Sequence, residues 1–145
     1  MNQEILDFIK MGRVGVLAVE MPDGSPHAAT VHYANTENPL VFYFETDRGY
    51  RKAEPLLAKE TTRASLVIGF DEKEMKTLQI DGTARLLQDE EKGIFQETYL
   101  GKFPEKVAMS AKHDLVFFTL TPTWWRFTDW TKPKGKAILT STDAS

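Results

Sequence analysis

Hydrophobic and polar residues alternate along much of the chain, a period of two that is typical of β-strands with one buried face. In the segment 40–46, for example, Leu40, Phe42 and Phe44 fall on one face. This pattern predicts strands over 14–19, 27–34, 40–46, 64–70, 76–87, 115–120 and 124–130. The turn residues at 21–26 join the first two segments as a hairpin. We therefore predict six or seven antiparallel strands.

Three segments have the longer spacing of a helix. Residues 3–10 form a short amphipathic helix that ends near Gly12, and residues 89–101 return to helical spacing. Residues 50–60 are also helical in pattern if the helix proper begins near Glu54, because its first turn can then accommodate Pro55. Antiparallel strands with one helix after the third predict a mainly β fold, a small closed or split β-barrel of Greek-key type with peripheral helices.

Gly82 lies in the middle of the predicted strand 76–87. A glycine at such a position usually marks a β-bulge or the close approach of another backbone or a ligand. We expect one of these at Gly82.

Length and composition favour one domain over residues 1–130, followed by a frayed, flexible tail over 131–145 that is rich in Lys, Thr and Ser. The chain has 145 residues, a hydrophobic content of 41% and a net charge of −3. That charge does not favour broad binding to nucleic acid or to an anionic membrane. The absence of cysteine excludes disulfides and thiolate chemistry and is compatible with the cytoplasm, and no segment is long and apolar enough to suggest a membrane anchor.

The segment 44–52 is the clearest candidate for chemistry. Here a strand leads through Thr46 and a glycine turn into Arg51 and Lys52 at the start of a helix. Free backbone N–H groups and two cations at such a turn can bind a phosphate. The simpler interpretation is that both cations are solvated, as is usual on a surface helix.

The histidines and tryptophans give weaker signals. His27 and His32 fall on opposite faces of one strand, so a metal site built from the three histidines is not expected. His32 is either a neighbour of a planar ligand or, in the simpler interpretation, a hydrogen-bonded surface or cleft histidine. Alternation places Trp125 with Phe127 on one face of the last strand and Trp124 on the other, which indicates one core face and either a dimer face or a wall beside a planar cofactor.

Together these elements resemble the pyridoxamine 5′-phosphate oxidase-like family of FMN-binding split barrels, especially its short, general-stress-protein-like members. The resemblance covers nearly the whole chain, and the order and spacing of its motifs carry it. These motifs are Arg13-Val14-Gly15-Val16-Leu17-Ala18, Asp23-Gly24-Ser25-Pro26-His27-Ala28-Ala29, the segment 44–52, Arg63-Ala64-Ser65-Leu66, Ile80-Asp81-Gly82-Thr83-Ala84 and Leu120-Thr121-Pro122.

The resemblance implies a homodimer with an FMN in each of two clefts between subunits. The residues that fall on the family's cofactor-binding positions are Ala29, Thr30, Val31 and His32 for the ribityl chain and ring, Thr46, Arg51 and Lys52 for the phosphate, and Gln79 on a strand that approaches the ring from the partner subunit. Tyr50 stands where the family often has a serine immediately before the basic pair, which alters the phosphate turn.

The function implied is that of an FMN-dependent oxidoreductase acting on a small molecule, with an electron donor such as NAD(P)H. Oxidation of pyridoxamine phosphate itself is not expected, because Arg126-Phe127-Thr128 lacks the histidine of the family's C-terminal Arg-x-His motif. Two alternatives remain open: a non-catalytic flavin-binding protein of the stress response, and a member of the fold that binds deazaflavin or haem.

Overall fold

The chain forms an antiparallel sheet in which seven strands follow the order β2-β1-β5-β6-β7-β4-β3 and a short β8 pairs with β7. The computed structural model describes residues 1–69, 71–133, 135 and 137–142. The strands are β1 (Val14–Glu20), β2 (Pro26–His32), β3 (Ala34–Glu37), β4 (Leu40–Asp47), β5 (Thr61–Ile68), β6 (Lys76–Leu86), β7 (Leu115–Asp129) and β8 (Ala137–Thr140). The predicted mainly β, antiparallel architecture is confirmed.

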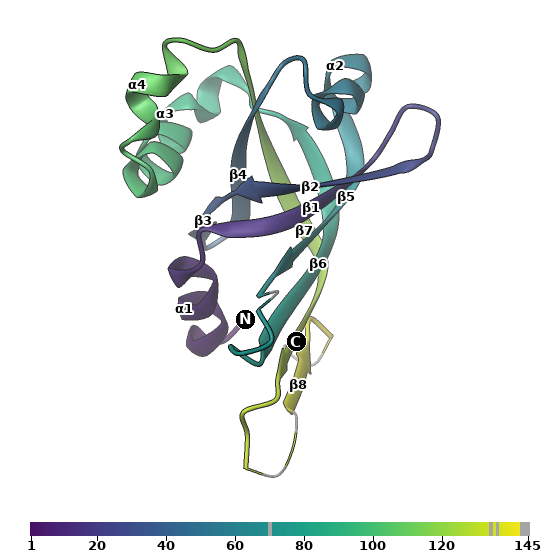
Figure 1. Cartoon of the computed structure of the whole chain (residues 1–145), viewed down its shortest axis with the longest axis vertical. Coiled ribbons are helices and arrows are strands. Elements are labelled where there is room, and N and C mark those ends of the chain that lie inside the picture. The colour runs from purple at the N-terminus through teal and green to yellow at the C-terminus, as the bar shows by residue number, and fades with distance from the viewer. Residues whose placement is uncertain (70, 134, 136, 143–145) are drawn as a thin grey trace.

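The sheet is curled into a split barrel. Figure 1 shows β1 and β2 crossing over the strands β4, β6 and β7, and contacts between β2 and β4 bring the two sides of the sheet together. Alternate residues of β1, β4, β5, β6 and β7 therefore face a common interior, as in β1, where Leu17 and Val19 are buried and their neighbours are half-buried. The large side chains of this interior include Phe42, Phe44, Leu66, Leu78 and Phe118.

Helix α1 (Gln3–Met11) lies against β3 at one end of the barrel (Figure 1). Its start is fixed by Asn2, whose side chain accepts a hydrogen bond from the backbone N–H of Ile5. Ile5 and Ile9 form its buried face. The helix predicted over 3–10 is thus present.

The second predicted helix consists of a 3₁₀ turn, η1 (Arg51–Ala53), and α2 (Glu54–Lys59). The helix proper begins at Glu54 with Pro55 in its first turn, as predicted. Because η1 and α2 are so short, their macrodipole is small, and attraction of an anion to this turn depends mainly on side chains.

The third helical region consists of η2 (Asp89–Glu91), α3 (Lys92–Phe95) and η3 (Gln96–Leu100), and it is followed by α4 (Lys106–Ser110). These helices cover the outer side of β3 and β4, where Phe95, Tyr99 and Phe103 pack with Ala34 and Tyr43 in a second hydrophobic cluster. Helix α4 is not predicted by the sequence pattern. This second cluster determines where α4 lies, and α4 forms one wall of the site described below.

Strand β7 replaces two predicted strands, since 115–120 and 124–130 form one continuous strand. Its pairing with β6 shifts register between Asp81 and Gly82, which confirms the irregularity expected at Gly82. A Cβ atom at Gly82 would overlap the carbonyl oxygen of Thr121, so the glycine permits the close approach of β7. Trp125 and Phe127 are buried and Trp124 is half-buried, as their alternation predicts.

The C-terminal segment differs from the frayed tail expected over 131–145. Residues 137–140 form β8, which pairs with β7 from Ala137↔Asp129 to Thr140↔Arg126. Backbone pairing with an available edge orders this segment although its side chains are half-buried or exposed. Residues 143–145, and Phe70 at the end of the predicted strand 64–70, lie outside the described residues.

Candidate functional site

A cavity of about 330 Å³ lies between the end of β2, the end of β4 with its following turn, and helix α4. Six of the nine residues predicted to bind a cofactor line it: Thr30, Val31, His32, Thr46, Tyr50 and Lys52. These residues come from two separate segments of the chain, and contacts of β2 with β4 and η1 bring them together.

The turn after β4 supplies a hydroxyl and a cation to this cavity. The Oγ1 atom of Thr46 is buried and has no hydrogen-bond partner among the described residues. Lys52 is half-buried, and burial lowers its pKa although the charge of Asp47 opposes this shift. Its ammonium lies 4.8 Å from the centre of the Tyr50 ring, and within the described chain no carboxylate forms an ion pair with it.

Arg51 is placed differently from Lys52. It is exposed and does not line the cavity. Its charge contributes to the low pKa of Asp23 in the β1–β2 turn, where hydrogen bonds from Ser25 are the larger cause. Of the predicted phosphate residues, Thr46 and Lys52 therefore share the cavity, whereas Arg51 lies outside it.

The opposite wall of the cavity carries a polar cluster centred on Lys106. The Nζ atom of Lys106 lies 3.3 Å from Nδ1 of His32, 3.0 Å from the hydroxyl of Tyr99 and 3.7 Å from Oε1 of Glu45. The Lys106 ammonium also lies 5.4 Å from the centre of the Phe103 ring. This cluster joins β2, β4, η3 and α4 at the cavity.

Glu45 is the acidic member of this cluster. Its side chain is only 10% exposed, and its Oε2 atom is buried without a hydrogen-bond partner among the described residues. Burial raises its pKa, and the nearby ammonium of Lys106 only partly offsets that effect. The cavity thus contains a carboxyl group that is protonated more readily than an ordinary glutamate.

Ala29 and Gln79 lie outside the cavity. Ala29 is half-buried in β2 and pairs with Leu17 of β1. Gln79 is half-buried on β6 and accepts a hydrogen bond of 2.8 Å from Nη2 of Arg126. Within one copy of the chain, neither side chain lines the site formed by Thr46 and Lys52.

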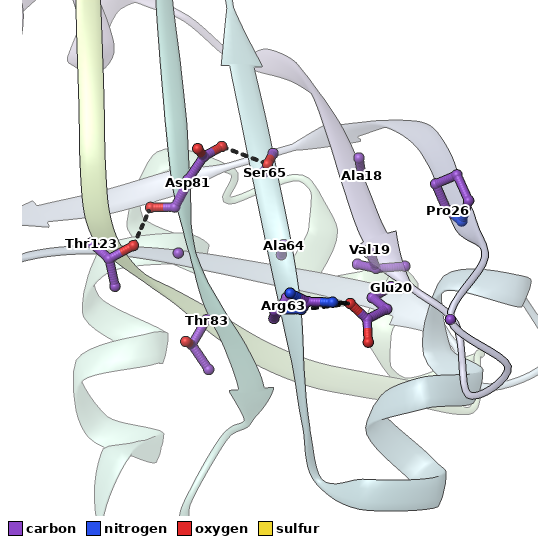
Figure 2. Close-up of a pocket in the computed structure, with 12 residues that line it drawn as sticks. Ala18, Val19, Glu20, Pro26, Arg63, Ala64, Ser65, Asp81, Thr83 and Thr123 are labelled. Atoms are coloured by element: carbon purple, nitrogen blue, oxygen red, sulfur yellow. Dashed lines mark hydrogen bonds and ion pairs between the residues drawn. The ribbon is translucent and has the colours of Figure 1, made fainter.

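A second, larger hollow of about 500 Å³ lies beside β1, β5 and β6. Figure 2 shows three interactions among the residues that line it: Ser65 donates to the carboxylate of Asp81 (2.7 Å), the hydroxyl of Thr123 donates to the Asp81 backbone carbonyl (3.2 Å), and Arg63 pairs with Glu20. Its charged side chains are already paired, so this hollow offers less to an anionic ligand than the cavity at Lys52.

The polar groups of the cavity at Lys52 are of the kinds that bind a flavin phosphate. An unsatisfied buried hydroxyl costs on the order of 1–3 kcal/mol, and a phosphate oxygen would satisfy that of Thr46. A phosphate would also give Lys52 an ion-pair partner, which the charge of Asp47 nearby does not provide. The residues present therefore fit the phosphate end of FMN, with Thr30, Val31 and His32 next to it on β2.

Sequence reasoning missed Lys106 and the role of Glu45. Lys106 follows Pro104 in a segment without strand or helix periodicity, and its contact with His32 joins residues 74 positions apart. One signal was available for Glu45, because it shares a strand face with Val41 and Tyr43. A carboxylate on an apolar face requires a partner, although the pattern does not identify that partner.

The described residues contain no group of three or more His, Cys, Asp or Glu residues placed to hold a metal ion. None of the described helices is both long and apolar enough to cross a bilayer.

Solved structures with the same fold include three informative neighbours. A heme binding protein from Mycobacterium smegmatis has a TM-score of 0.72 and 14% identity, and the match covers 99% of this chain but 60% of that one. A Clostridium acetobutylicum protein related to general stress protein 26 of B. subtilis has a TM-score of 0.68 and 14% identity, with 98% and 95% of the two chains covered. A pyridoxamine 5′-phosphate oxidase-related, FMN binding protein from Nostoc punctiforme PCC 73102 has a TM-score of 0.67 and 14% identity, with 95% and 88% covered.

At these identities the structural likeness establishes the fold alone, and this chain spans only about 60% of the length of the M. smegmatis protein. No curated protein gives a significant match to the sequence. The family model described as pyridoxamine 5′-phosphate oxidase, however, matches residues 1–129, which is most of the chain. The chain therefore belongs to the pyridoxamine 5′-phosphate oxidase family and has structural neighbours among its general-stress-protein-26-like members.

Proposed function

We propose that this protein binds FMN in the cavity between β2, β4 and α4 and is a flavin-dependent oxidoreductase acting on a small molecule. One observation carries the proposal: the unpartnered hydroxyl of Thr46 and the unpaired ammonium of Lys52 lie in the same cavity, among the described residues. Membership of the family and the likeness to an FMN binding protein support the choice of ligand.

Each part of the site has a separate role in this proposal. Thr46 and Lys52 bind the phosphate, and Val31 and Thr30 line the path along β2. The ring of Tyr50 makes a cation–π contact with the ammonium of Lys52 and so holds it at this end of the cavity. When bound, FMN supplies hydride transfer, while the protein provides binding, orientation and electrostatic tuning.

We propose a homodimer, in which Gln79 and Arg126 reach the cofactor of the second copy. The half-buried side chains of Val16 and Val67, which are paired across β1 and β5, and of Trp124 on β7 support this, because each leaves apolar surface on the outer face of the sheet. Light scattering at micromolar concentration should give twice the mass of one chain. A monomer would remove the intersubunit part of the site and would leave the cavity at Lys52 intact.

Reduction by NAD(P)H separates an enzyme from a flavin carrier or sensor. The FMN-loaded protein is mixed anaerobically with NADH or NADPH, and the flavin absorbance is followed. Bleaching within seconds is expected of the oxidoreductase. A stable flavin spectrum with either donor would favour the non-catalytic, stress-response alternative.

Haem and deazaflavin are the alternative ligands within the same fold. The likeness to a heme binding protein supports testing for haem. A Soret band in the purified protein, or tighter binding of deazaflavin than of FMN, would replace the proposed cofactor.

A further inference from the structure

His32 lies where β2 ends at the cavity, and one contact determines which of its ring nitrogens carries the proton. The Nζ atom of Lys106 is 3.3 Å from Nδ1 of His32. A protonated lysine can donate hydrogen bonds but cannot accept one, so Nδ1 must be the acceptor in this contact. In a neutral imidazole the other nitrogen, Nε2, then carries the hydrogen.

The position of Lys106 does not depend on His32. Its ammonium donates to the hydroxyl of Tyr99 at 3.0 Å and lies 3.7 Å from Oε1 of Glu45. Tyr99 is only 1% exposed and stacks on Phe95, at 5.0 Å between ring centres. The lysine is therefore held by η3 and β4 and presents its remaining donor to His32.

The plane of the His32 ring is fixed by a second neighbour. The ring meets Phe103 edge to face, with 5.3 Å between the ring centres and 71° between the planes. Among the described residues the imidazole ring of His32 has no hydrogen-bond partner besides Lys106. The Nε2 edge is thus free, and His32 lines the cavity as an exposed residue.

The surrounding charges favour the neutral ring. Partial desolvation of the ring at the cavity wall is the first cause of the lowered pKa of His32, and the cations Lys106 and Arg13 lower it further, whereas Glu105 opposes them. Arg13 and Glu105 form an ion pair of 2.8 Å, so their charges partly cancel at His32. Other titratable side chains that line the same cavity are Glu45, Asp47, Tyr50, Lys52 and His113.

We propose that Lys106 is a positioning residue that holds His32 as the neutral Nε2–H tautomer, so that His32 donates a hydrogen bond to an acceptor atom such as a carbonyl oxygen of a planar ligand. The choice of ligand rests on the proposed function, whereas the tautomer does not. A consequence is that His32 is a poor ligand for haem iron, because the Nε2 lone pair is occupied by a proton while Lys106 donates to Nδ1. The same contact therefore selects for a hydrogen-bonding ligand over a coordinating metal.

The tautomer is measured on the full chain without any ligand. Long-range ¹H–¹⁵N correlation spectra distinguish protonated from unprotonated imidazole nitrogens, and the His27→Gln and His113→Gln variants assign the His32 signals. At neutral pH we expect an unprotonated Nδ1 and a protonated Nε2. An Nδ1–H tautomer, or a doubly protonated ring, would overturn the proposal.

Replacement of Lys106 tests whether this lysine determines the tautomer of His32. In Lys106→Met we expect a mixture of both tautomers and a higher pKa for His32, because the hydrogen bond and the opposing charge are both lost. Lys112→Met, at an exposed lysine shortly after α4, is the matched control and should give the wild-type spectrum. A Lys106→Met spectrum identical to that of the wild type would overturn the assignment. If Lys106→Met does not fold, the tautomer measured in the wild-type protein still confirms or overturns the proposal.

Addition of FMN to the same sample tests the choice of ligand. If His32 donates to the bound flavin, its Nε2 hydrogen exchanges more slowly with water and its nitrogen shift changes. Saturable FMN binding with an unchanged His32 signal would overturn the assignment of His32 as a donor to this ligand. Absence of FMN binding would overturn the proposed function and leave the tautomer standing.

Discussion

Replacement of Lys52 with methionine should weaken FMN binding while the protein stays folded. Lys52 is half-buried at the cavity, and no described carboxylate forms an ion pair with it. A charge-assisted hydrogen bond from such a group contributes about 1.5–3 kcal/mol. Since 1.4 kcal/mol corresponds to a factor of ten, we expect Kd for FMN to rise roughly 10- to 100-fold.

Riboflavin separates the phosphate contact from the rest of the site, because it has the ring and ribityl chain of FMN without the phosphate. Titrations followed by quenching of flavin fluorescence should show that Lys52→Met binds riboflavin as the wild type does and loses only its preference for FMN. Lys59→Met, at an exposed lysine in the last turn of α2, is the control and should bind both flavins normally. Unchanged FMN affinity, or an equal loss for both flavins, would refute the assignment of Lys52 to the phosphate.

The stability of Lys52→Met distinguishes lost binding from unfolding. Burial lowers the pKa of Lys52, so the folded state disfavours its charged form. Below the ordinary lysine pKa, where the unfolded chain is charged, removal of the ammonium should therefore leave the free energy of unfolding unchanged or slightly increase it. Thermal unfolding of the ligand-free proteins checks this, and a lower Tm for Lys52→Met would indicate a structural role.

Two further predictions concern the bulge and the buried carboxyl. Gly82→Ala would place its Cβ against the carbonyl of Thr121, and we expect the free energy of unfolding, measured in urea, to fall by about 1–3 kcal/mol. The control is Gly93→Ala, in α3 with open space around it, which should leave stability unchanged or increase it. Equal effects of the two changes would contradict a close approach of β7 at Gly82. Glu45 has a raised pKa, so its ionisation destabilises the folded state as pH rises above its ordinary value of 4.5. Glu45→Gln should therefore raise Tm at neutral pH, and its advantage should disappear in acid below that value; a variant less stable than the wild type at neutral pH would show that the ion pair with Lys106 outweighs burial.

The strands that form most of the barrel could be predicted because each buries one face, and this produces an alternation of apolar and polar residues within the strand's own sequence. The segment 40–46 is the clearest example and corresponds closely to β4. The two four-residue strands could not be predicted in this way. In β3 the sequence Ala-Asn-Thr-Glu has no apolar alternation, and β8 is ordered by pairing with the edge offered by β7.

The same distinction applies to the candidate site. Thr46 and Lys52 are close in sequence, so a strand, a turn and a basic residue are sufficient to predict that they meet. Lys106 reaches His32 only because Tyr99 and Phe103 pack against the outer side of β3 and β4 and so fix the position at which α4 begins. A contact of this kind depends on tertiary packing and leaves no periodic signal.

The most direct test of the account is an absorbance and fluorescence titration of the purified protein with FMN, preceded by a spectrum of the untreated sample. We predict a flavin spectrum in the sample or saturable binding with a dissociation constant in the micromolar range or tighter. A Soret band, or no change in FMN fluorescence at saturating protein, would contradict the proposal that this cavity binds FMN.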